Sequence, residues 1–253
     1  MKDEERKLPR AVEVKTYGLA ACRALWKRRP DDILRVYTTA EVARIVGPLL
    51  AHCAERRRPY RVVPASELET ITESRHHEGL CIVASPRPNV ALPEVLTITG
   101  PACILALAGI ENPHNLGAIV RSAAHFGAHA LLLGEDEPRL AGAAARTAQG
   151  GAEWVDVVRV PALVPALLTC RRAGFTIVAT SNQEGRALFD EPLPPRVVVL
   201  LGSERAGLSP DLLRSSDLIV RIPGTDHVDS LNVAAAAAVL LAESWRRRAR
   251  PAP

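Results

Sequence analysis

The chain has 253 residues, of which 47% are hydrophobic and 24% charged, with a net charge of +4 and a pI near 9.0. This length suffices for two domains with separate cores, and the composition is typical of soluble globular proteins. Polar or charged residues interrupt every apolar stretch, and residues 1–10 are charged, which argues against a membrane-spanning helix and a secretory signal. We therefore expect a cytoplasmic protein. Its basic excess favours a phosphate-rich partner only weakly.

The five cysteines and the arginine clusters restrict the chemistry further. Because the cysteines are odd in number and form no CxxC pair, the sequence indicates neither a zinc site nor a disulfide framework. We expect free thiols and no metal. Basic residues cluster at 27–29, 56–58 and 246–248. Two interpretations of these clusters stay open, namely solvated helix ends and guanidinium groups that bind phosphate.

After a disordered charged tail at 1–10, residues 11–85 predict a small α/β domain. Helical spacing and short apolar runs define its elements. The expected helices cover 19–26, 42–55 and 66–71, and the expected strands cover 33–37, 60–63 and 80–84. Residues 86–101 contain four prolines and little periodicity, which predicts a linker.

Residues 102–253 predict a second α/β domain, in which a parallel sheet is covered by helices on both faces. The expected strands cover 104–108, 130–133, 155–160, 175–180, 196–201 and 218–222, and the helices 115–127, 140–149, 162–173, 209–214 and 230–248. Such sheets bind ligands beyond the carboxyl ends of their strands. The informative loops should therefore follow Ala108, Thr180, Leu201 and Ile222.

The loop after Ala108 leads into a helix that offers groups for an anion. Asn115 is a suitable N-cap, and the free N–H groups of a helix start suit phosphate. Arg121 follows one to two turns later, close enough to aim at the same point. A capped turn and a surface arginine are the structural alternatives.

The segments 202–210 and 222–233 are also unusual. The first has two glycines but neither the lysine of a P-loop nor the G-x-G-x-x-G spacing, which disfavours a nucleotide triphosphate site and an NAD-type oxidoreductase. A loop whose backbone approaches a ligand remains. The second enters an alanine-rich helix with Ser230 as the expected N-cap. Its Asp, His and Ser residues are poor evidence for a hydrolase or metal site, because no G-x-S-x-G elbow accompanies them.

Together the three segments resemble the motifs of the SpoU/TrmH family of RNA ribose 2′-O-methyltransferases. They are N-P-H-N-L-G-A-I-V-R-S-A at 112–123, L-L-G-S-E-R-A-G-L-S at 200–209 and I-P-G-T-D-H-V-D-S-L-N-V-A at 222–234. The resemblance covers about residues 102–248. The first domain is similar to the L30e-like substrate-binding domain that often precedes it, because Tyr17-Gly18 and His77-Glu78-Gly79 resemble its Gly and His-Gln-Gly signatures.

The resemblance implies methyl transfer from S-adenosylmethionine to a ribose 2′-hydroxyl of tRNA or rRNA. It also implies a SPOUT domain with a deep trefoil knot, formed where the chain after Ile222 threads through an earlier loop, and a homodimer whose active site uses both protomers. By the family's pattern, Gly202, Ile222 and Leu231 contact the cofactor. We expect Thr180, at the end of its strand, to line the same pocket.

Arg121 matches the family's catalytic arginine. Because a guanidinium stays protonated, we expect it to fix an RNA phosphate and to stabilise negative charge on oxygen rather than to act as a base. Four further residues match motif positions, namely Asn112, Glu204, Ser230 and Asn232. The resemblance implies that the two asparagines orient backbone or substrate and that Glu204 holds Arg121 or the knot loops. Capping alone is the alternative for Glu204 and Ser230.

The third motif departs from the family where Gly224 and Asp226 replace the usual Met and Gly. Asp226 adds negative charge near the cofactor carboxylate or the RNA, which leaves the contacts of this loop open. A rival function from another class also stays open: a non-catalytic RNA-binding or assembly protein that kept the knot.

Overall fold

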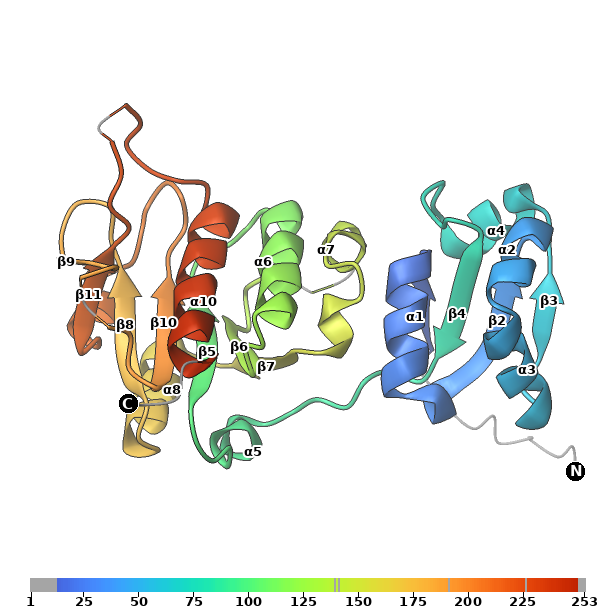
Figure 1. Ribbon diagram of the computed structural model, residues 1–253, viewed down its shortest axis with the longest axis horizontal. Helices are drawn as coiled ribbons and strands as arrows, with labels where there is room; N and C mark the ends of the chain where they lie inside the picture. Colours follow the sequence, from blue (N-terminus) through green and yellow to red (C-terminus); the bar gives the residue numbers. More distant parts are fainter. Residues whose placement is uncertain (1–12, 139, 141, 191, 226, 250–253) are drawn as a thin grey trace, which may run out of the picture. The chain divides into compact units, whose positions relative to one another are not determined.

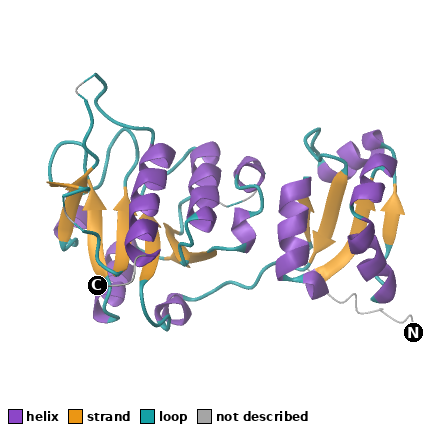
Figure 2. Cartoon of the chain, in the orientation of Figure 1, coloured by secondary structure: helices purple, strands orange, loops and turns teal. Residues whose placement is uncertain are grey.

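The computed structural model describes residues 13–138, 140, 142–190, 192–225 and 227–249. They form two compact units, Met1–Pro88 and Asn89–Pro253, each built from strands and covering helices (Figures 1 and 2). The expected tail at 1–10 and Asp226 lie outside the described residues. In the part of the chain that is described, no helix combines the length and apolar character needed to span a bilayer.

The first unit is a four-stranded sheet in the order β1-β4-β2-β3, with β2 antiparallel to β4 and parallel to β3. Its strands are β1 (Val14–Tyr17), β2 (Ile33–Thr38), β3 (Tyr60–Val62) and β4 (Leu80–Ala84), and its helices α1 (Leu19–Arg28), α2 (Ala40–Ile45), α3 (Gly47–Glu55) and α4 (Ala65–Thr72), with a 3-10 turn η1 (Pro30–Asp32). The expected single helix over 42–55 is wrong. Pro48 has no N–H to donate, so the helix ends at Ile45 and α3 begins with that proline in its first turn.

The two signature-like segments of the first unit lie together. The Leu19 N–H donates to the Glu78 carboxylate at 2.8 Å, and the Gly18 N–H donates to the Leu80 carbonyl at 3.1 Å. Gly79 has a φ of +75°, and a Cβ there would lie 2.5 Å from Val42 Cγ2. The Glu78 carboxylate and the absence of a side chain at Gly79 therefore each have a structural reason.

The second unit confirms the expected parallel sheet. Its seven strands follow the order β7-β6-β5-β10-β8-β11-β9, and all neighbouring pairs are parallel. The strands are β5 (Ala102–Leu107), β6 (Ala130–Gly134), β7 (Asp156–Val160), β8 (Thr176–Thr180), β9 (Arg186–Ala187), β10 (Arg196–Leu201) and β11 (Leu218–Arg221). The helices are α5 (Leu92–Leu96), α6 (Pro113–His125), α7 (Ala143–Thr147), α8 (Leu163–Arg172), α9 (Pro210–Arg214) and α10 (Val233–Ala249), with a 3-10 turn η2 (Gly151–Glu153). The helix expected over 140–149 is thus shorter than predicted.

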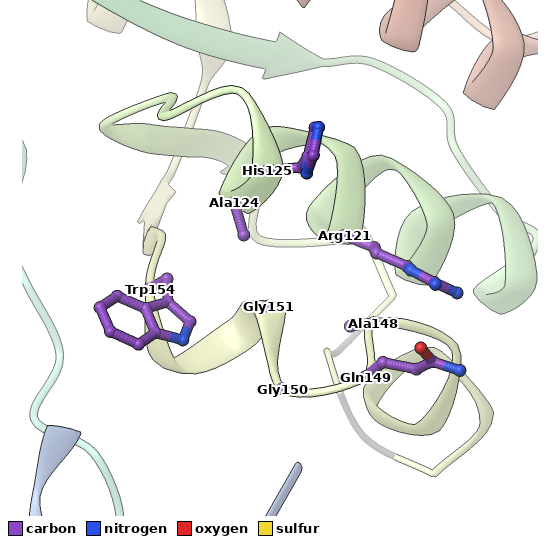
Figure 3. A pocket seen from close by; sticks show the side chains of 8 residues that line it. All are labelled: Arg121, Ala124, His125, Ala148, Gln149, Gly150, Gly151 and Trp154. Atoms are coloured by element: carbon purple, nitrogen blue, oxygen red, sulfur yellow. The ribbon is translucent and has the colours of Figure 1, made fainter. Parts of the chain in front are cut away.

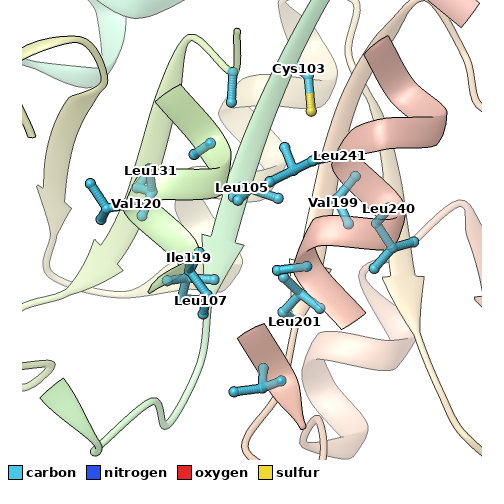
Figure 4. Packing of buried hydrophobic residues seen from close by; sticks show 14 of the residues in the cluster. Cys103, Leu105, Leu107, Ile119, Val120, Leu131, Val199, Leu201, Leu240 and Leu241 are labelled. Atoms are coloured by element: carbon cyan, nitrogen blue, oxygen red, sulfur yellow. The ribbon is translucent and has the colours of Figure 1, made fainter. Parts of the chain in front are cut away.

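Both faces of this sheet are buried, which explains its continuous apolar strands. Along β5, Leu105 and Leu107 join a core with residues of α6 and α10, whereas Ile104 and Ala106 face a second core with residues of α8 and α9. Figure 4 shows the first of these cores, in which Ile119 of α6 lies beside the β5 side chains. Side chains alternate across a strand, so both sets of alternate residues must be apolar.

Residues 89–101, most of the segment expected as a linker, pack onto the second unit. Val95 is 3% exposed within the second core. The Arg196 guanidinium donates to the carbonyls of Ile98 at 2.7 Å and Gly100 at 3.0 Å, and lies 4.3 Å from the centre of the Phe175 ring. This arginine fixes the approach to β5.

All five cysteines are buried and free, and burial raises the pKa of the Cys81 and Cys170 thiols to about 11. No His, Cys, Asp and Glu side chains among the described residues are grouped as a metal site would require.

The arginine run at 246–248 has partners within the chain. Arg246 and Arg247 pair with Glu243 at 2.7 and 2.8 Å, and Arg248 donates to carbonyls at the end of α6. These arginines are held by groups of the chain rather than only by solvent, and phosphate binding by this cluster stays a prediction.

Gly117 allows α6 to approach α7 closely, and replacing it tests this contact. An added Cβ would lie 2.4 Å from the Ala144 carbonyl oxygen and 2.6 Å from Thr147 Cβ. We expect Gly117→Ala to lower the free energy of unfolding by roughly 1–3 kcal/mol, because overpacking outweighs the better helix propensity of alanine. Urea unfolding of the whole chain measures it. Gly134→Ala is the control, since its nearest neighbour would lie 3.8 Å away. A Gly117→Ala variant at least as stable as the wild type would contradict the contact.

Candidate functional site

Three of the expected cofactor contacts lie at one edge of the sheet. Strands β10, β8 and β11 are neighbours, so the loops that follow them start side by side. Thr180 ends β8, Gly202 follows β10, and Ile222 follows β11. The Thr180 hydroxyl donates to the Leu200 carbonyl at 3.0 Å, which fixes its side chain against β10. Leu231 belongs to the loop before α10, where its side chain is 46% exposed.

A polar cluster joins the three motif segments, and we call it the Glu204 cluster (Asn115, Glu204, Asn232 and the Val233 N–H). One oxygen of Glu204 accepts from the Asn232 amide at 2.7 Å, the Asn115 amide at 3.0 Å and the Val233 N–H at 3.1 Å. The Asn232 amide also donates to the Asn115 side-chain oxygen at 3.2 Å. A single carboxylate therefore ties the loop after β10 to the starts of α6 and α10.

The caps of these two helices differ from the expected ones. Asn112 caps α6 by accepting from the His114 N–H at 2.9 Å, because Pro113 occupies the first helical position. Asn115 is thereby inside the helix, and its side chain reaches Glu204. Asn232 caps α10 by accepting from the N–H groups of Ala234 and Ala235, so the prediction of Ser230 as the cap is wrong. Ser230 lies exposed in the preceding loop.

The loop that begins at Gly202 folds back on itself. A Cβ on Gly202 would lie 2.3 Å from the Gly207 carbonyl carbon and 2.7 Å from the Leu208 nitrogen. The Gly207 N–H donates to the Ser203 carbonyl at 3.0 Å, closing the turn. The backbone of this loop therefore requires glycine at 202, whether or not Gly202 also contacts a cofactor.

Glu137 holds the loop between β5 and α6, and sequence reasoning missed it. Its carboxylate accepts from the N–H groups of Gly109 and Ile110, the latter at 3.0 Å. Arg159 in turn donates to the Glu137 carbonyl at 2.9 Å and the Pro138 carbonyl at 2.7 Å. Nothing in the sequence around Glu137 distinguishes it from an ordinary surface glutamate. Its partners, the N–H groups of Gly109 and Ile110, follow strand β5 and are distant from it in sequence.

Arg121 lies apart from the Glu204 cluster. It follows Asn115 by six positions on α6, which places it about 9 Å further along the axis and about 120° around it. Its side chain lines an open pocket of about 260 Å³ (Figure 3). The lining residues are Arg121, Ala124, His125, Ala148, Gln149, Gly150, Gly151 and Trp154. Within its own chain Arg121 therefore does not aim at the start of α6. The hydrogen bonds described for Glu204 go to the cluster rather than to Arg121.

Comparison with known proteins assigns the family. The model of the SpoU rRNA methylase family matches residues 102–242, which include all three motif segments. The chain belongs to the SpoU rRNA methylase family. A second family model, described as RNA 2′-O ribose methyltransferase substrate binding, matches residues 16–90 of the first unit.

Individual SpoU relatives are similar along most of the chain. The uncharacterized tRNA/rRNA methyltransferase YfiF of Escherichia coli O157:H7 is 39% identical over 240 residues, which cover 94% of this chain and 69% of the relative. The 23S rRNA (guanosine-2′-O-)-methyltransferase RlmB of Bordetella pertussis is 32% identical over 235 residues, 91% of this chain and 96% of the relative. The solved structure of the SpoU methyltransferase AviRb from Streptomyces viridochromogenes, in complex with AdoMet, has a TM-score of 0.77 at 24% identity and covers 93% of this chain and 90% of AviRb. That likeness establishes the fold.

Removing the Glu204 carboxylate tests whether it holds the motif loops. We expect Glu204→Ala to lower the free energy of unfolding by roughly 1–3 kcal/mol, because three donors lose a charged acceptor. We also expect faster hydrogen exchange of the Val233 amide. Glu204→Gln keeps an acceptor oxygen and should lose less. Glu184→Ala, at an exposed glutamate after β8, is the control. Unchanged exchange at Val233 in Glu204→Ala would refute the assignment.

Proposed function

We propose that this SpoU-family chain transfers a methyl group from S-adenosylmethionine to a ribose 2′-hydroxyl in rRNA or tRNA. The observation that carries the proposal is the Glu204 cluster, which joins the three motif segments beside the carboxyl ends of β10, β8 and β11. Ligands of parallel sheets bind at such edges. The RlmB relative, named for 2′-O-methylation of a guanosine in 23S rRNA, supports the ribose as the methylated group.

The residues at this edge fit S-adenosylmethionine. Val228 and Leu231 are 68% and 46% exposed on the loop before α10, where they offer apolar surface that an adenine ring could cover. Thr180, Gly202 and Ile222 would enclose the same ligand from the ends of three adjacent strands. When bound, the cofactor supplies an electrophilic methyl group on a sulfonium.

The remaining expected residues divide the other tasks. The enzyme must align the ribose oxygen with the methyl group, exclude water and stabilise charge as the hydroxyl loses its proton. Arg121 is assigned to an RNA phosphate and to negative charge on oxygen, because its guanidinium keeps its proton. Asn112 and Asn232 orient the backbone, which their capping bonds support. Ser230 is exposed beside Leu231, which supports a role in contacting the substrate.

We further propose a homodimer whose active site uses both protomers. Arg121 and Asn115 lie about 120° apart around α6, so one chain presents Arg121 away from its own Glu204 cluster. A second copy would bring its Arg121 to that cluster. The separation of the two groups within one chain supports this arrangement.

The knot and the L30e-like character of the first unit are proposals of the same kind. Strand β11 is the last strand along the chain and lies next to the edge strand β9. After it the chain returns across the sheet, so that α10 packs against β10, β5 and α6. On this path the Val233 N–H meets Glu204 of the loop after β10, which is where a knotted chain would be held. The substrate-binding family model over 16–90 supports RNA binding by the first unit.

Transfer of labelled methyl groups from S-adenosylmethionine to bacterial rRNA and tRNA tests the activity, with digestion to show 2′-O-methyl nucleosides. We expect Arg121→Ala to lower kcat by about 10²–10³-fold through loss of charge stabilisation. Arg172→Ala, an exposed arginine of α8, should retain activity. Calorimetry with S-adenosylmethionine accompanies the assay. A protein that binds the cofactor but methylates neither RNA would sink the proposal, and one that does not bind it would favour a non-catalytic RNA-binding role.

Mixing two inactive variants tests the shared active site. Leu231→Glu should prevent cofactor binding by placing a charge on the apolar surface, whereas Arg121→Ala should still bind it. If Arg121 acts on the partner's site, co-refolded heterodimers contain one intact site, and activity returns to about a quarter of the wild-type value for random mixing. Sites formed within one chain would restore none. Refolding each variant alone is the control.

A further inference from the structure

The basic run at 56–58 closes helix α3 in a conformation that glycine usually adopts. The Arg57 N–H donates to the Ala54 carbonyl at 3.1 Å and the Arg58 N–H to the Cys53 carbonyl at 2.7 Å, which is the hydrogen-bond pattern of a Schellman motif. Arg57 occupies the left-handed position of this motif with a φ of +53°. A side chain is unfavourable in that conformation, so the backbone gives no reason for an arginine. The reason therefore lies in the side chain.

Asp31 fixes the two other arginines of the run, but not Arg57. The Arg56 guanidinium pairs with the Asp31 carboxylate at 2.5 Å, and the Arg58 guanidinium donates to the Asp31 carbonyl at 3.4 Å. Arg57 is exposed, and among the residues that the structure describes no group accepts from its guanidinium. A backbone held by two hydrogen bonds thus presents a charge that no carboxylate neutralises.

Asp31 also joins this run to the basic run at 27–29. It belongs to η1, which directly follows that run, so α1 and α3 both end beside η1 where β2 begins (Figure 1). The segments 27–32 and 55–58 hold six basic side chains and three carboxylates, a net charge of +3, whereas the whole chain carries +4. Most of the chain's excess positive charge is therefore concentrated here. We call 27–29 and 56–58 together the η1 basic surface.

Helix dipoles offer a structural explanation for part of this charge. The carbonyl groups at the ends of α1 and α3 carry partial negative charge, and basic side chains beside them stabilise a helix. That explanation applies to Arg57 only if its charge stabilises the chain more than its left-handed conformation destabilises it. The balance of these two effects can be measured.

We propose that the η1 basic surface binds the phosphate backbone of helical RNA. Guanidinium groups match the geometry of phosphate oxygens, and proteins recognise double-stranded RNA largely through backbone contacts. Neither segment, 27–32 or 55–58, contains an aromatic residue, so the surface offers no platform on which the bases of a single strand could stack. The proposal rests on the proposed function for RNA as the partner, and it names the surface with which the first unit would hold that RNA.

The η1 basic surface lies where the chain leaves the first unit. The Arg29 guanidinium donates to the Ser85 carbonyl at 2.6 Å, and the Ser85 N–H donates to the Asp32 carbonyl at 3.0 Å. RNA bound here would be held beside the segment that leads to the second unit. Contacts to phosphate carry no sequence information. The surface would therefore raise the affinity for RNA without selecting the nucleotide.

Replacing Arg57 by glycine separates phosphate binding from helix stabilisation. We expect Arg57→Gly to bind an RNA duplex of about 20 base pairs roughly five- to tenfold more weakly at about 0.1 M salt, and to lower the slope of log Kd against log salt by about 0.9, as for one lost phosphate contact. The urea midpoint should equal or exceed the wild-type value, because glycine suits the left-handed position. Arg57→Lys should retain most of the affinity. Unchanged affinity and slope in Arg57→Gly would overturn the proposal, and a lower midpoint with them would identify a helix-stabilising charge instead.

Three further variants complete this experiment. Glu73→Gly makes the same exchange at the left-handed end of α4, where φ is +55°, and Arg172→Gln removes one exposed charge from α8. Both should bind the duplex like the wild type. An equal loss in Arg172→Gln would indicate an effect of net charge alone and would overturn the proposal. Adding Lys27→Gln to Arg57→Gly should about double the change in slope, and no further change would refute the joining of the two runs in one surface.

Methyl transfer distinguishes failure of this proposal from failure of the proposed function. We expect Arg57→Gly to raise KM for rRNA about as much as it raises Kd for the duplex. Its kcat and its calorimetric affinity for S-adenosylmethionine should stay near wild type, because Arg57 belongs to the first unit and to no motif segment. Duplex binding that depends on Arg57, in a chain that methylates no RNA, would retain the surface and reject the activity. Methylation with a KM that Arg57→Gly leaves unchanged would do the reverse.

Discussion

The second unit depends on one constraint: in a wholly parallel sheet every strand delivers its loop to the same edge. Loops gathered in this way have no regular backbone pairing, so other groups must fix them. Two carboxylates do so in this chain. Glu204 accepts from both helix starts beside it, and Glu137 accepts from two N–H groups of the loop after β5. The geometry of the candidate site therefore follows from two acidic side chains rather than from the strands alone.

The position of Glu204 bears on whether a phosphate can bind at the starts of α6 and α10. The starts of α6 and α10 carry the positive ends of helix dipoles, which attract anions. Glu204 already lies between those starts, and Asn112 and Asn232 already cap them. An RNA phosphate at the same point would meet a carboxylate. Arg121 lies on another face of α6, away from this carboxylate, which supports the proposal that Arg121 rather than the helix starts contacts an RNA phosphate.

The features that could be predicted from the sequence are those that depend on the local pattern of residues. The core strands of the second unit were predictable because both faces are apolar. Strand β1 was missed because Val14–Tyr17 lies half exposed and shows no apolar run. The N-caps of α6 and α10 were each misplaced by two or three residues. Each stretch holds two residues that can cap a helix, and the sequence does not show at which of the two the helix begins. Glu137 could not be found, because its partners Gly109 and Ile110 are distant from it in sequence. The motif segments gave the family but not the separation of Arg121 from the Glu204 cluster.

That separation bears on how the reaction would be controlled. In one chain the Glu204 cluster and Arg121 lie about 120° apart around α6, so a monomer would hold the proposed methyl donor and the proposed RNA contact apart. If a second copy brings its Arg121 to the cofactor edge, the complete site exists only in the assembled dimer. Activity would then depend on protomer concentration as well as on ligands, because assembly and site formation are one equilibrium. A free protomer could bind cofactor without being able to use it.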